Sequence, residues 1–588
     1  MRKRGLKRTA AMMTLTLAML VSACSGNNGG TTPANNGGTD NTGAEKPAAE
    51  TTQELTTLRV LVVEPGTKWN TYPDSVIAKE IARKVGVKIE YVEADDNKFN
   101  VMLAGGDLPD IVRADPNKYA KQLIEGNLIV PMDDMLAAHG GDITANVPGV
   151  VEYSKKNWSA GQDKVFFLPP QVQPKPSPVA KTMTIGPTIR WEYYKEIGTP
   201  EIKNTDDLLN ALEQIVAKHP TTEDGKKIYG VSMWQDWGLW PYSIPFIFET
   251  QQLAANTDIM VKEEGTDQYI NFLTNEKSSF WKAMEFYNQA NLRGLLDPDA
   301  LTMKHNDYLA KATAGQFVVG PATWAMGDFN SQYAKDGKGY VVIPAGKLLW
   351  SGGVGPLGWA DKSYSISKSS KNPEKAMEFL NYLYSYEGAR AMYSGIEGEH
   401  WEMVDGKPVL KDATFTLKNE GGAAWESTGI ALDRNLIGLG SSVEDPATGT
   451  PVDLFTTVDA LAKNVTALEK DFSEHYGASY PGEVVQKLVE EGKYNDFSTP
   501  YQGLSDDEIV AMATIVTPVL DEELTKIEAQ LKELGARHAA RIILSKNEAE
   551  FEKNKQEALK AFKDAGAEKI TEYYTAAYTE ARAAAGVK

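Results

Sequence analysis

Cysteine and histidine are scarce in this chain, which has one cysteine, Cys24, and six histidines in 588 residues. A single thiol cannot form a disulfide within the chain, and no histidine lies at metal-ligand spacing from another. The P-loop, HExxH and GxSxG motifs are missing. The one GxGxxG string, Gly353–Gly358, contains Pro356 and precedes no helical pattern. We therefore predict no metal, no cofactor and no enzymatic activity, although the 80 acidic residues leave a glycosidase carboxylate pair as an open alternative.

The N-terminus has the pattern of a secretory signal. Five basic residues between Arg2 and Arg8 precede an apolar run from Ala10 to Val21. This run is shorter than the roughly 20 residues that span a bilayer. The segment Val21–Cys24 resembles the lipobox of bacterial lipoproteins, in which the cysteine is acylated and becomes the new N-terminus. We predict that residues 1–23 are removed and that Cys24 carries the lipid.

Basic residues are also fewer than acidic ones, with 61 Lys and Arg against 80 Asp and Glu. Loss of the five basic signal residues takes the formal net charge from −19 to −24. Such a field repels nucleic acid and anionic lipid headgroups, so we expect contact with the membrane only through the lipid. After Cys24, residues up to about Gln53 are Gly, Asn, Thr, Pro and Ala with almost nothing apolar, which predicts a disordered linker.

Order is expected from about Leu55, where strand and helix patterns alternate. The predicted elements are a strand at Leu58–Val63, a helix at Asp74–Val85, a strand around Val87–Tyr91, a helical piece around Phe99–Leu103 and a strand at Asp110–Arg113. This order predicts a parallel sheet, in which ligands bind at the carboxyl ends of strands. Later patterns predict a helix capped by Thr205, strands at Lys227–Met233, Val341–Ile343 and Tyr364–Ile366, a helix through Ala376–Leu383, and a helical tail that begins with a capping box at Ser505.

Aromatic residues are abundant, with 12 tryptophans and 25 tyrosines. Indole rings stack on the apolar faces of sugars, and a few placed polar groups bind the hydroxyls. A single tryptophan is more often part of a core. Trp234, Trp237 and Trp240, however, lie within seven residues after a predicted strand and are hard to bury together.

Four segments resemble family 1 extracellular solute-binding proteins, the receptors of ABC importers. They are Ala104–Ile111 (AGGDLPDI), Asn127–Asp133 (NLIVPMD), Lys371–Leu380 (KNPEKAMEFL) and Tyr393–Gly398 (YSGIEG). The resemblance implies an α/β, two-lobed, periplasmic-binding-protein-like fold (type II) with a ligand cleft between the lobes and a helical C-terminal segment. The implied divisions are 1–23 signal peptide, 24–54 lipidated cysteine and linker, 55–185 first lobe, 186–352 second lobe, 353–400 return to the first lobe, and 401–588 additions to the second lobe with the C-terminal helices.

The resemblance also implies ligand-binding residues. In the Gly-Pro-Trp-Ala-Trp segment of the family this chain has Ala322 at the first tryptophan position, which leaves Trp324. The family's calcium loop falls near His219–Lys227, where the expected acidic run is missing, so no metal is predicted. The expected ligand-binding residues are Glu64, Trp69, Arg113, Asp115, Arg190, Trp234, Gln235, Asp236, Trp237, Trp324 and Trp359.

These features predict a monomeric receptor, anchored by lipid at the extracellular face of the cell membrane, that delivers an oligosaccharide to ABC permease subunits. Three alternatives stay open: a receptor for a peptide or cationic solute, a surface polysaccharide hydrolase, and a cell-surface adhesin.

Overall fold

The structure is a computed structural model that describes residues 55–62, 68–175, 183, 185–242, 247–250, 252–254, 259–263, 269–346, 348–349, 355–493, 495–496 and 520–584. Cys24, Glu64 and the Ser505 capping box lie outside the described residues. Two four-stranded sheets organise the described chain, with strand orders β12-β3-β1-β2 and β10-β4-β9-β5.

The first sheet forms from the alternating pattern near the start of the ordered chain. Its strands are β1 (Thr56–Val62), β2 (Val87–Glu93), β3 (Ile111–Ala114) and β12 (Ser363–Ile366). Its helices include α1 (Val76–Val85), α2 (Asp96–Gly105), α3 (Pro116–Glu125), α4 (Asp133–His139), α5 (Gly141–Asn146), α6 (Pro148–Asn157), α13 (Pro373–Tyr384) and α14 (Tyr386–Ser394). β1 pairs in parallel with β2 and β3, as predicted, and β12 joins β3 as an antiparallel edge.

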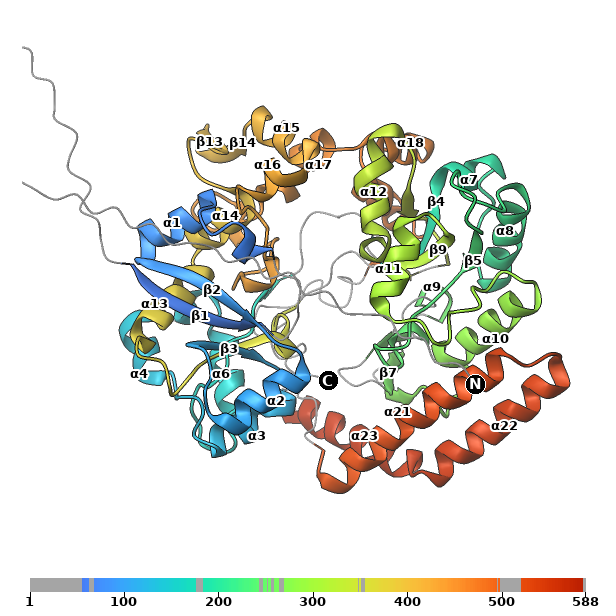
Figure 1. Cartoon of the computed structure of the whole chain (residues 1–588), viewed down its shortest axis with the longest axis horizontal. Coiled ribbons are helices and arrows are strands. Elements are labelled where there is room, and N and C mark those ends of the chain that lie inside the picture. Colours follow the sequence, from blue (N-terminus) through green and yellow to red (C-terminus); the bar gives the residue numbers. More distant parts are fainter. Residues whose placement is uncertain are drawn as a thin grey trace, which may run out of the picture. The chain divides into compact units, whose positions relative to one another are not determined.

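The apolar run of β1 is buried on both faces of the sheet. Leu58 and Val60 pack in one core with side chains of α1 and α13. Leu61 packs in another with side chains of α2 and α3, and Figure 1 shows these helices around β1 and β2. A strand covered on both faces needs continuous rather than alternating apolar residues, which explains the LRVLV sequence. The predicted stop at Gly86 is confirmed, because this residue adopts φ +77° after α1.

The second sheet contains β4 (Ile185–Arg190), β5 (Tyr229–Val231), β9 (Phe317–Ala322) and β10 (Tyr340–Val342). Its helices include α7 (Trp191–Glu196), α8 (Thr205–Lys218), α10 (Ser279–Leu292), α11 (His305–Thr313) and α12 (Gly327–Tyr333). β9 pairs with β5 in parallel and with β4 antiparallel. The cap of α8 differs from the prediction: Asn204, not Thr205, accepts a hydrogen bond from the backbone N–H of Asp207.

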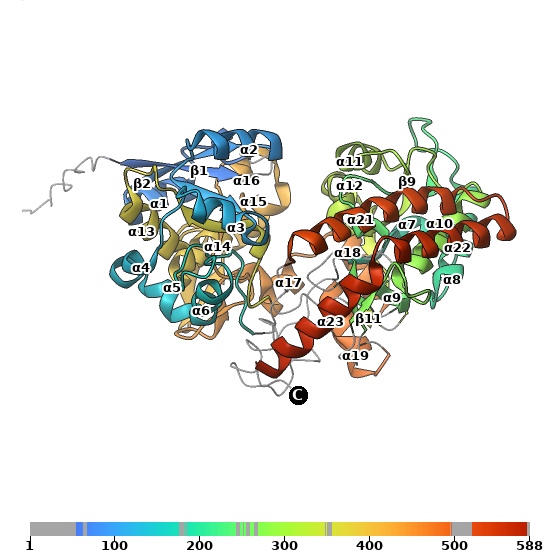
Figure 2. The ribbon, with the colours of Figure 1, turned by 90° about the horizontal axis from the view of Figure 1, so that it is seen from below.

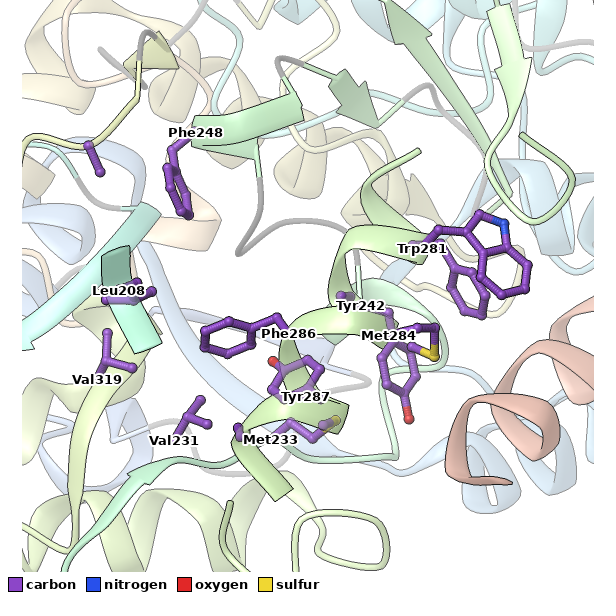
Figure 3. Close-up of a cluster of buried hydrophobic side chains, with 14 of the residues drawn as sticks. Leu208, Val231, Met233, Tyr242, Phe248, Trp281, Met284, Phe286, Tyr287 and Val319 are labelled. Carbon is purple, nitrogen blue, oxygen red and sulfur yellow. The ribbon is translucent and has the colours of Figure 1, made fainter. Parts of the chain in front are cut away.

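A large aromatic core supports the second sheet. Figure 3 shows Phe286 and Tyr287 of α10 close to Val231 of β5 and Met233 just beyond it. Tyr242, from the short helix η2 (Trp240–Tyr242), belongs to the same core. The chain that follows β5 is therefore anchored on both sides by fully packed side chains.

Residues after 400 divide between the two cores. The elements there are β13 (Trp401–Val404), β14 (Lys407–Leu410), α15 (Asp412–Glu420), α16 (Gly422–Glu426), β15 (Glu444–Asp445), β16 (Thr450–Pro451), α17 (Val458–Lys463), α18 (Ala467–His475) and α19 (Pro481–Glu490). Buried side chains from Trp401 to Ala460 pack in the core of the first sheet. The prediction assigned them to the second lobe and is corrected here, because the side chains of β13 to α17 share a core with side chains of β1, α13 and α14. The other predicted divisions stay predictions.

The helical C-terminal segment is confirmed. It consists of α21 (Glu522–Ile543), α22 (Glu548–Asp564) and α23 (Ala567–Ala584). Figure 2 shows α21 and α22 side by side. Leu531 and Ile542 of α21 and Phe562 of α22 are buried in the core that contains α10. Small sheets complete the described chain: β6 (Gln252–Ala254), β7 (Met260–Glu263) and β8 (Tyr269–Asn271) form one, and β11 (Leu348–Leu349) pairs with β17 (Asn495–Asp496).

Candidate functional site

Four indole rings meet at the carboxyl ends of β5 and β9. Because these strands are parallel, with Val231 opposite Val319, the segments that follow them leave the sheet at the same edge. The segment after β5 carries Trp234, Trp237 and Trp240, and η4 (Thr323–Met326), after β9, carries Trp324. We call Trp234, Trp237, Trp240 and Trp324, with the imidazole of His305, the tryptophan cluster. Ring centroids of neighbouring indoles in it are 5.4 to 6.0 Å apart.

The cluster has a buried layer and an exposed layer. Trp234 is 1% exposed and stacks on Trp240. Trp237 and Trp324 are 43% and 40% exposed, and their rings stack with centroids 5.5 Å apart at an interplanar angle of 23°. The exposed pair forms an apolar surface of the kind that accepts a ring-shaped ligand. The prediction that these indoles are hard to bury together is thus correct for Trp237 and not for Trp234.

Polar contacts hold the segment after β5 in place. The side-chain amide of Gln235 donates to the carbonyl of Ala300 at 3.0 Å and accepts from the hydroxyl of Tyr242 at 2.9 Å. The carboxylate of Asp236 accepts from the backbone N–H of His305 at 2.9 Å, at the start of α11. Gln235 was predicted to bind ligand hydroxyls, but both ends of its amide are already bound within the protein. Asp236 is exposed and keeps further acceptor capacity.

Arg190, predicted to bind ligand, is held by groups of the protein itself. Its guanidinium donates to Glu192 at 2.7 Å and lies over the rings of Tyr193 and Phe329, 4.5 and 4.2 Å from their centroids. The residue is only 6% exposed. A buried guanidinium needs an ion pair and aromatic neighbours to offset its lost hydration, and these partners occupy the group that the prediction assigned to a ligand.

Two more predicted residues belong to the core of the first sheet. Trp69 is 2% exposed, and its ring meets Tyr91 edge to face at 5.9 Å. Arg113 is 4% exposed on β3, opposite Tyr364 of β12. Neither side chain presents a free surface in this structure, and their roles in ligand binding stay predictions. Buried cores cover both faces of this sheet, so side chains near its strand ends are buried as well.

A second polar and aromatic group lies at the carboxyl end of β3. Asp115 caps α3 by accepting from the backbone N–H of Asn117 at 2.9 Å. Burial raises the pKa of the Asp115 carboxyl, and the Asp361 carboxylate on η6 (Ala360–Lys362) contributes in the same direction. Trp359, just before η6, is 44% exposed, with the ammonium of Lys362 4.7 Å from its ring centroid. The structure thus brings together Asp115 and the segment of Trp359, both predicted.

Sequence reasoning missed Asp361 and His305. Asp361 reaches Asp115 through the antiparallel pairing of β12 with β3, in which Ser363 lies opposite Ala114. Such a pairing across some 250 residues leaves no local signal. His305 was set aside because it has no histidine partner, yet its ring lies 4.4 Å from Trp237 and 4.9 Å from Trp234.

The turn near His219–Lys227 is where the resemblance places the family's calcium loop. In the residues that the structure describes, no group of three or more His, Cys, Asp and Glu side chains is arranged to hold an ion. In the turn near His219–Lys227, the Asp224 carboxylate pairs with the ammonium of Lys226 at 2.8 Å. The Lys226 and Thr222 hydrogen bonds lower the pKa of Asp224. One carboxylate beside a cation does not fit a calcium ion, which needs six to eight oxygens.

No helix in the described part of the chain combines the length and apolar character that a membrane crossing requires.

Comparisons with known proteins point to one family. Residues 68–390, more than half of the chain, match the family described as bacterial extracellular solute-binding protein. The fructooligosaccharide ABC transporter substrate-binding protein FusA of Streptococcus pneumoniae serotype 4 is 22% identical over 345 residues. That match covers 57% of this chain and 62% of FusA, so it spans less than two thirds of the relative.

Solved structures share the fold over almost their whole length. FusA of S. pneumoniae in complex with kestose has a TM-score of 0.56 at 16% identity, covering 90% of this chain and 100% of that one. The alginate-binding protein AlgQ2 without calcium ion has a TM-score of 0.55 at 16% identity, covering 90% and 99%. A human-milk-oligosaccharide (HMO) binding protein from Bifidobacterium longum infantis has a TM-score of 0.52 at 15% identity, covering 89% and 98%. These likenesses concern the fold alone, and they confirm the predicted two-lobed α/β class.

Proposed function

Since this chain belongs to the family of bacterial extracellular solute-binding proteins, we propose that it captures an oligosaccharide outside the cell and delivers it to the permease of an ABC importer. The observation that carries the proposal is the exposed pair Trp237 and Trp324, stacked at the carboxyl ends of two parallel strands. Exposed indoles of this size are costly to leave in water unless a ligand covers them.

The chemistry of the cluster suits a sugar. The C–H faces of a pyranose or furanose ring are apolar and pack on an indole, while its hydroxyls need hydrogen-bond partners. Asp236 beside Trp237, and Asp115 with Asp361 near Trp359, supply carboxylates that accept hydrogen bonds from hydroxyls. Trp237 therefore has the carboxylate of Asp236 next to it in the sequence, and Trp359 has that of Asp361 two residues away.

The relatives support the same ligand class. FusA is named for fructooligosaccharides and a further neighbour for human milk oligosaccharides. We propose an oligosaccharide rather than a peptide or a cationic solute, because the exposed side chains at the carboxyl ends of β5 and β9 are mainly indoles. The protein acts as a receptor and not as an enzyme.

A screen by thermal shift tests the ligand class. The chain without residues 1–24 is heated with a panel of plant and microbial oligosaccharides, and with peptides and polyamines as comparison ligands. A ligand at 100 times its Kd stabilises the fold by about 2.7 kcal/mol, which is readily measured. Stabilisation by one glycan class, without release of reducing ends, is the expected result. Stabilisation only by peptides or polyamines, or release of reducing ends, would contradict the proposal.

The pattern at the N-terminus supports a proposal for how the protein is held at the cell membrane. We propose that Cys24 is acylated after removal of residues 1–23 and that this lipid holds the receptor at the extracellular face of the cell membrane. At least two acyl chains are needed for stable anchoring. Replacing Cys24→Ser is expected to move the protein from the membrane fraction to the medium. Retention in the membrane fraction, with the fold intact, would refute the anchor.

A further inference from the structure

Two buried polar atoms of the tryptophan cluster have no hydrogen-bond partner among the residues that the structure describes. They are the indole Nε1 of Trp234 and the imidazole Nε2 of His305. Trp234 is 99% buried, since only 1% of it is exposed. The two rings are neighbours, with centroids 4.9 Å apart and planes tilted by 57°. An indole N–H is a donor only, whereas a neutral imidazole carries one donor and one acceptor nitrogen.

Such a pair is costly inside a folded protein. An unsatisfied buried donor or acceptor destabilises the fold, which is why nearly all such groups are paired. Trp234 meets Trp237 edge to face at 5.4 Å and 89°, but an N–H contact to a ring is much weaker than a hydrogen bond. The two atoms therefore form an unmet hydrogen-bonding requirement within the cluster that contains the exposed indoles.

His305 is suited to act as the acceptor of this pair. Burial lowers the pKa of its imidazole, and the Asp236 carboxylate opposes this only in part. The ring is therefore neutral near pH 7. With its proton on Nδ1, a neutral His305 offers the lone pair of Nε2 toward the cluster. A hydroxyl both donates and accepts, so a single hydroxyl has the chemistry to satisfy this nitrogen and the N–H of Trp234 together.

We propose that one hydroxyl of the bound glycan inserts between these atoms, donating to Nε2 of His305 and accepting from Nε1–H of Trp234. His305 is then a specificity-determining residue, and the inference rests on the proposed receptor function. The exposed indoles bind the ring faces of the sugar, and the buried pair selects glycans with a hydroxyl at the matching position. A site built to hydrogen-bond a hydroxyl discriminates strongly against analogues that lack it.

Access to the pair requires Trp237 to move. Its ring lies 4.4 Å from that of His305 and is 43% exposed, so it is the covering ring with most freedom. Gly238, the next residue, has φ +60°, and within the described chain no atom lies within 4 Å of the position of an added Cβ. The backbone beside Trp237 is therefore open, and entry of a glycan exchanges the contacts of the Trp237 ring with Trp324 and His305 for contacts with the sugar.

The test uses His305→Phe and His305→Gln in the chain without residues 1–24. The probe is the glycan with the largest thermal shift in the screen, and affinity is measured by isothermal titration calorimetry. Phenylalanine keeps the ring packing and removes the acceptor, so affinity is expected to fall about tenfold or more. Glutamine restores a polar atom at the ε position and is expected to recover most of the affinity. His219→Gln is the matched control, because that histidine stacks on Tyr193 and pairs with Glu196 outside the cluster.

The pH dependence of binding gives a second readout. A protonated imidazole can only donate, so wild-type affinity is expected to fall as the pH drops through the lowered pKa of His305, below its ordinary value of 6.5, while that of His305→Gln stays level. The other charged groups on the packed elements are Asp236, Lys304 and Asp307 around the start of α11 and Asp328 on α12.

The outcomes separate the inference from the function on which it rests. Unchanged affinity of His305→Phe, or a lower melting temperature with unchanged affinity, would assign the pair to a structural water and overturn the inference alone. Failure of every glycan to bind the wild-type chain would overturn the proposed function and this inference together.

Discussion

Replacing Trp237→Ala is expected to weaken oligosaccharide binding while leaving the fold intact. A tryptophan side chain has up to about 250 Å² of surface, and 43% of this residue is exposed, which leaves about 100 Å² for a ligand to cover. Covering half to all of it, at about 25 cal/mol per Å², contributes roughly 1.3–2.7 kcal/mol. This agrees with about 1–3 kcal/mol for stacking of bases on aromatic side chains. The dissociation constant is then expected to rise about tenfold to a hundredfold.

Calorimetric titration with the glycan identified by the thermal-shift screen measures this change. The matched control is Tyr333→Ala, because Tyr333 is also an exposed aromatic residue near the second sheet, at 39% exposure, and packs on Phe329 outside the cluster. Far-ultraviolet circular dichroism and the melting temperature check that both variants fold. An affinity for Trp237→Ala equal to that of the wild type and the control would refute the stacking role and the area argument behind it.

Three further changes test how the two sites are held. Asp236→Ala removes the acceptor for the backbone N–H of His305 at the start of α11 and is expected to lower the free energy of unfolding by about 1 kcal/mol. Asp236→Asn keeps an acceptor oxygen and is expected to lose much less. Equal losses for the two variants in urea unfolding would disprove the role of this hydrogen bond. Lys311→Met leaves without its cation the fully buried carboxylate of Asp297, which accepts from the hydroxyl of Ser232 just after β5. A loss of roughly 3–5 kcal/mol of unfolding free energy is expected, and a loss below about 1 kcal/mol would show that this ion pair does not hold the segment after β5. For Asp115 the folded-state pKa is raised above its ordinary value of 3.8, so protonation is favoured in the folded state. The stabilisation from the protonated Asp115 carboxyl is therefore fully present at low pH and is lost as the pH rises through the raised pKa. The free energy of unfolding of the wild type, relative to that of Asp115→Asn, is expected to fall as the pH rises through this range. A difference that does not change with pH would contradict the burial argument.

Much of the fold could be predicted because its signals are local. Apolar periodicity located α1 and α13, and the abrupt apolar run at Leu58 located β1, all of which the structure confirms. Strand ends then indicated where candidate ligand-binding residues lie, and Trp237 and Trp324 are exposed at such ends. The loop after β1, with Glu64, lies outside the described residues, so its role stays a prediction.

Several predicted site residues are buried in this structure. Arg113, Arg190 and Trp69 were predicted to bind ligand from the sequence, but a position in the sequence does not state which way a side chain points or what covers it. Each is buried by elements distant in sequence, such as β12 across from Arg113 and Phe329 beside Arg190. Gln235 points back to Tyr242 for the same reason. The division of residues after 400 between two cores likewise depends on contacts that no local pattern records.

The sequence by itself determined the helices and strands, the alternating order that makes parallel strands, and the concentration of indoles after Met233. These depend on periodicity and turn chemistry within a dozen residues. Only the tertiary structure decided that Trp234 is buried while Trp237 is exposed, that Trp324 joins them, and that the ring of His305 is their neighbour. The reason is that exposure and the pairing of polar atoms are set by which distant segments pack together, and β5 and β9 meet only when the whole second sheet has formed.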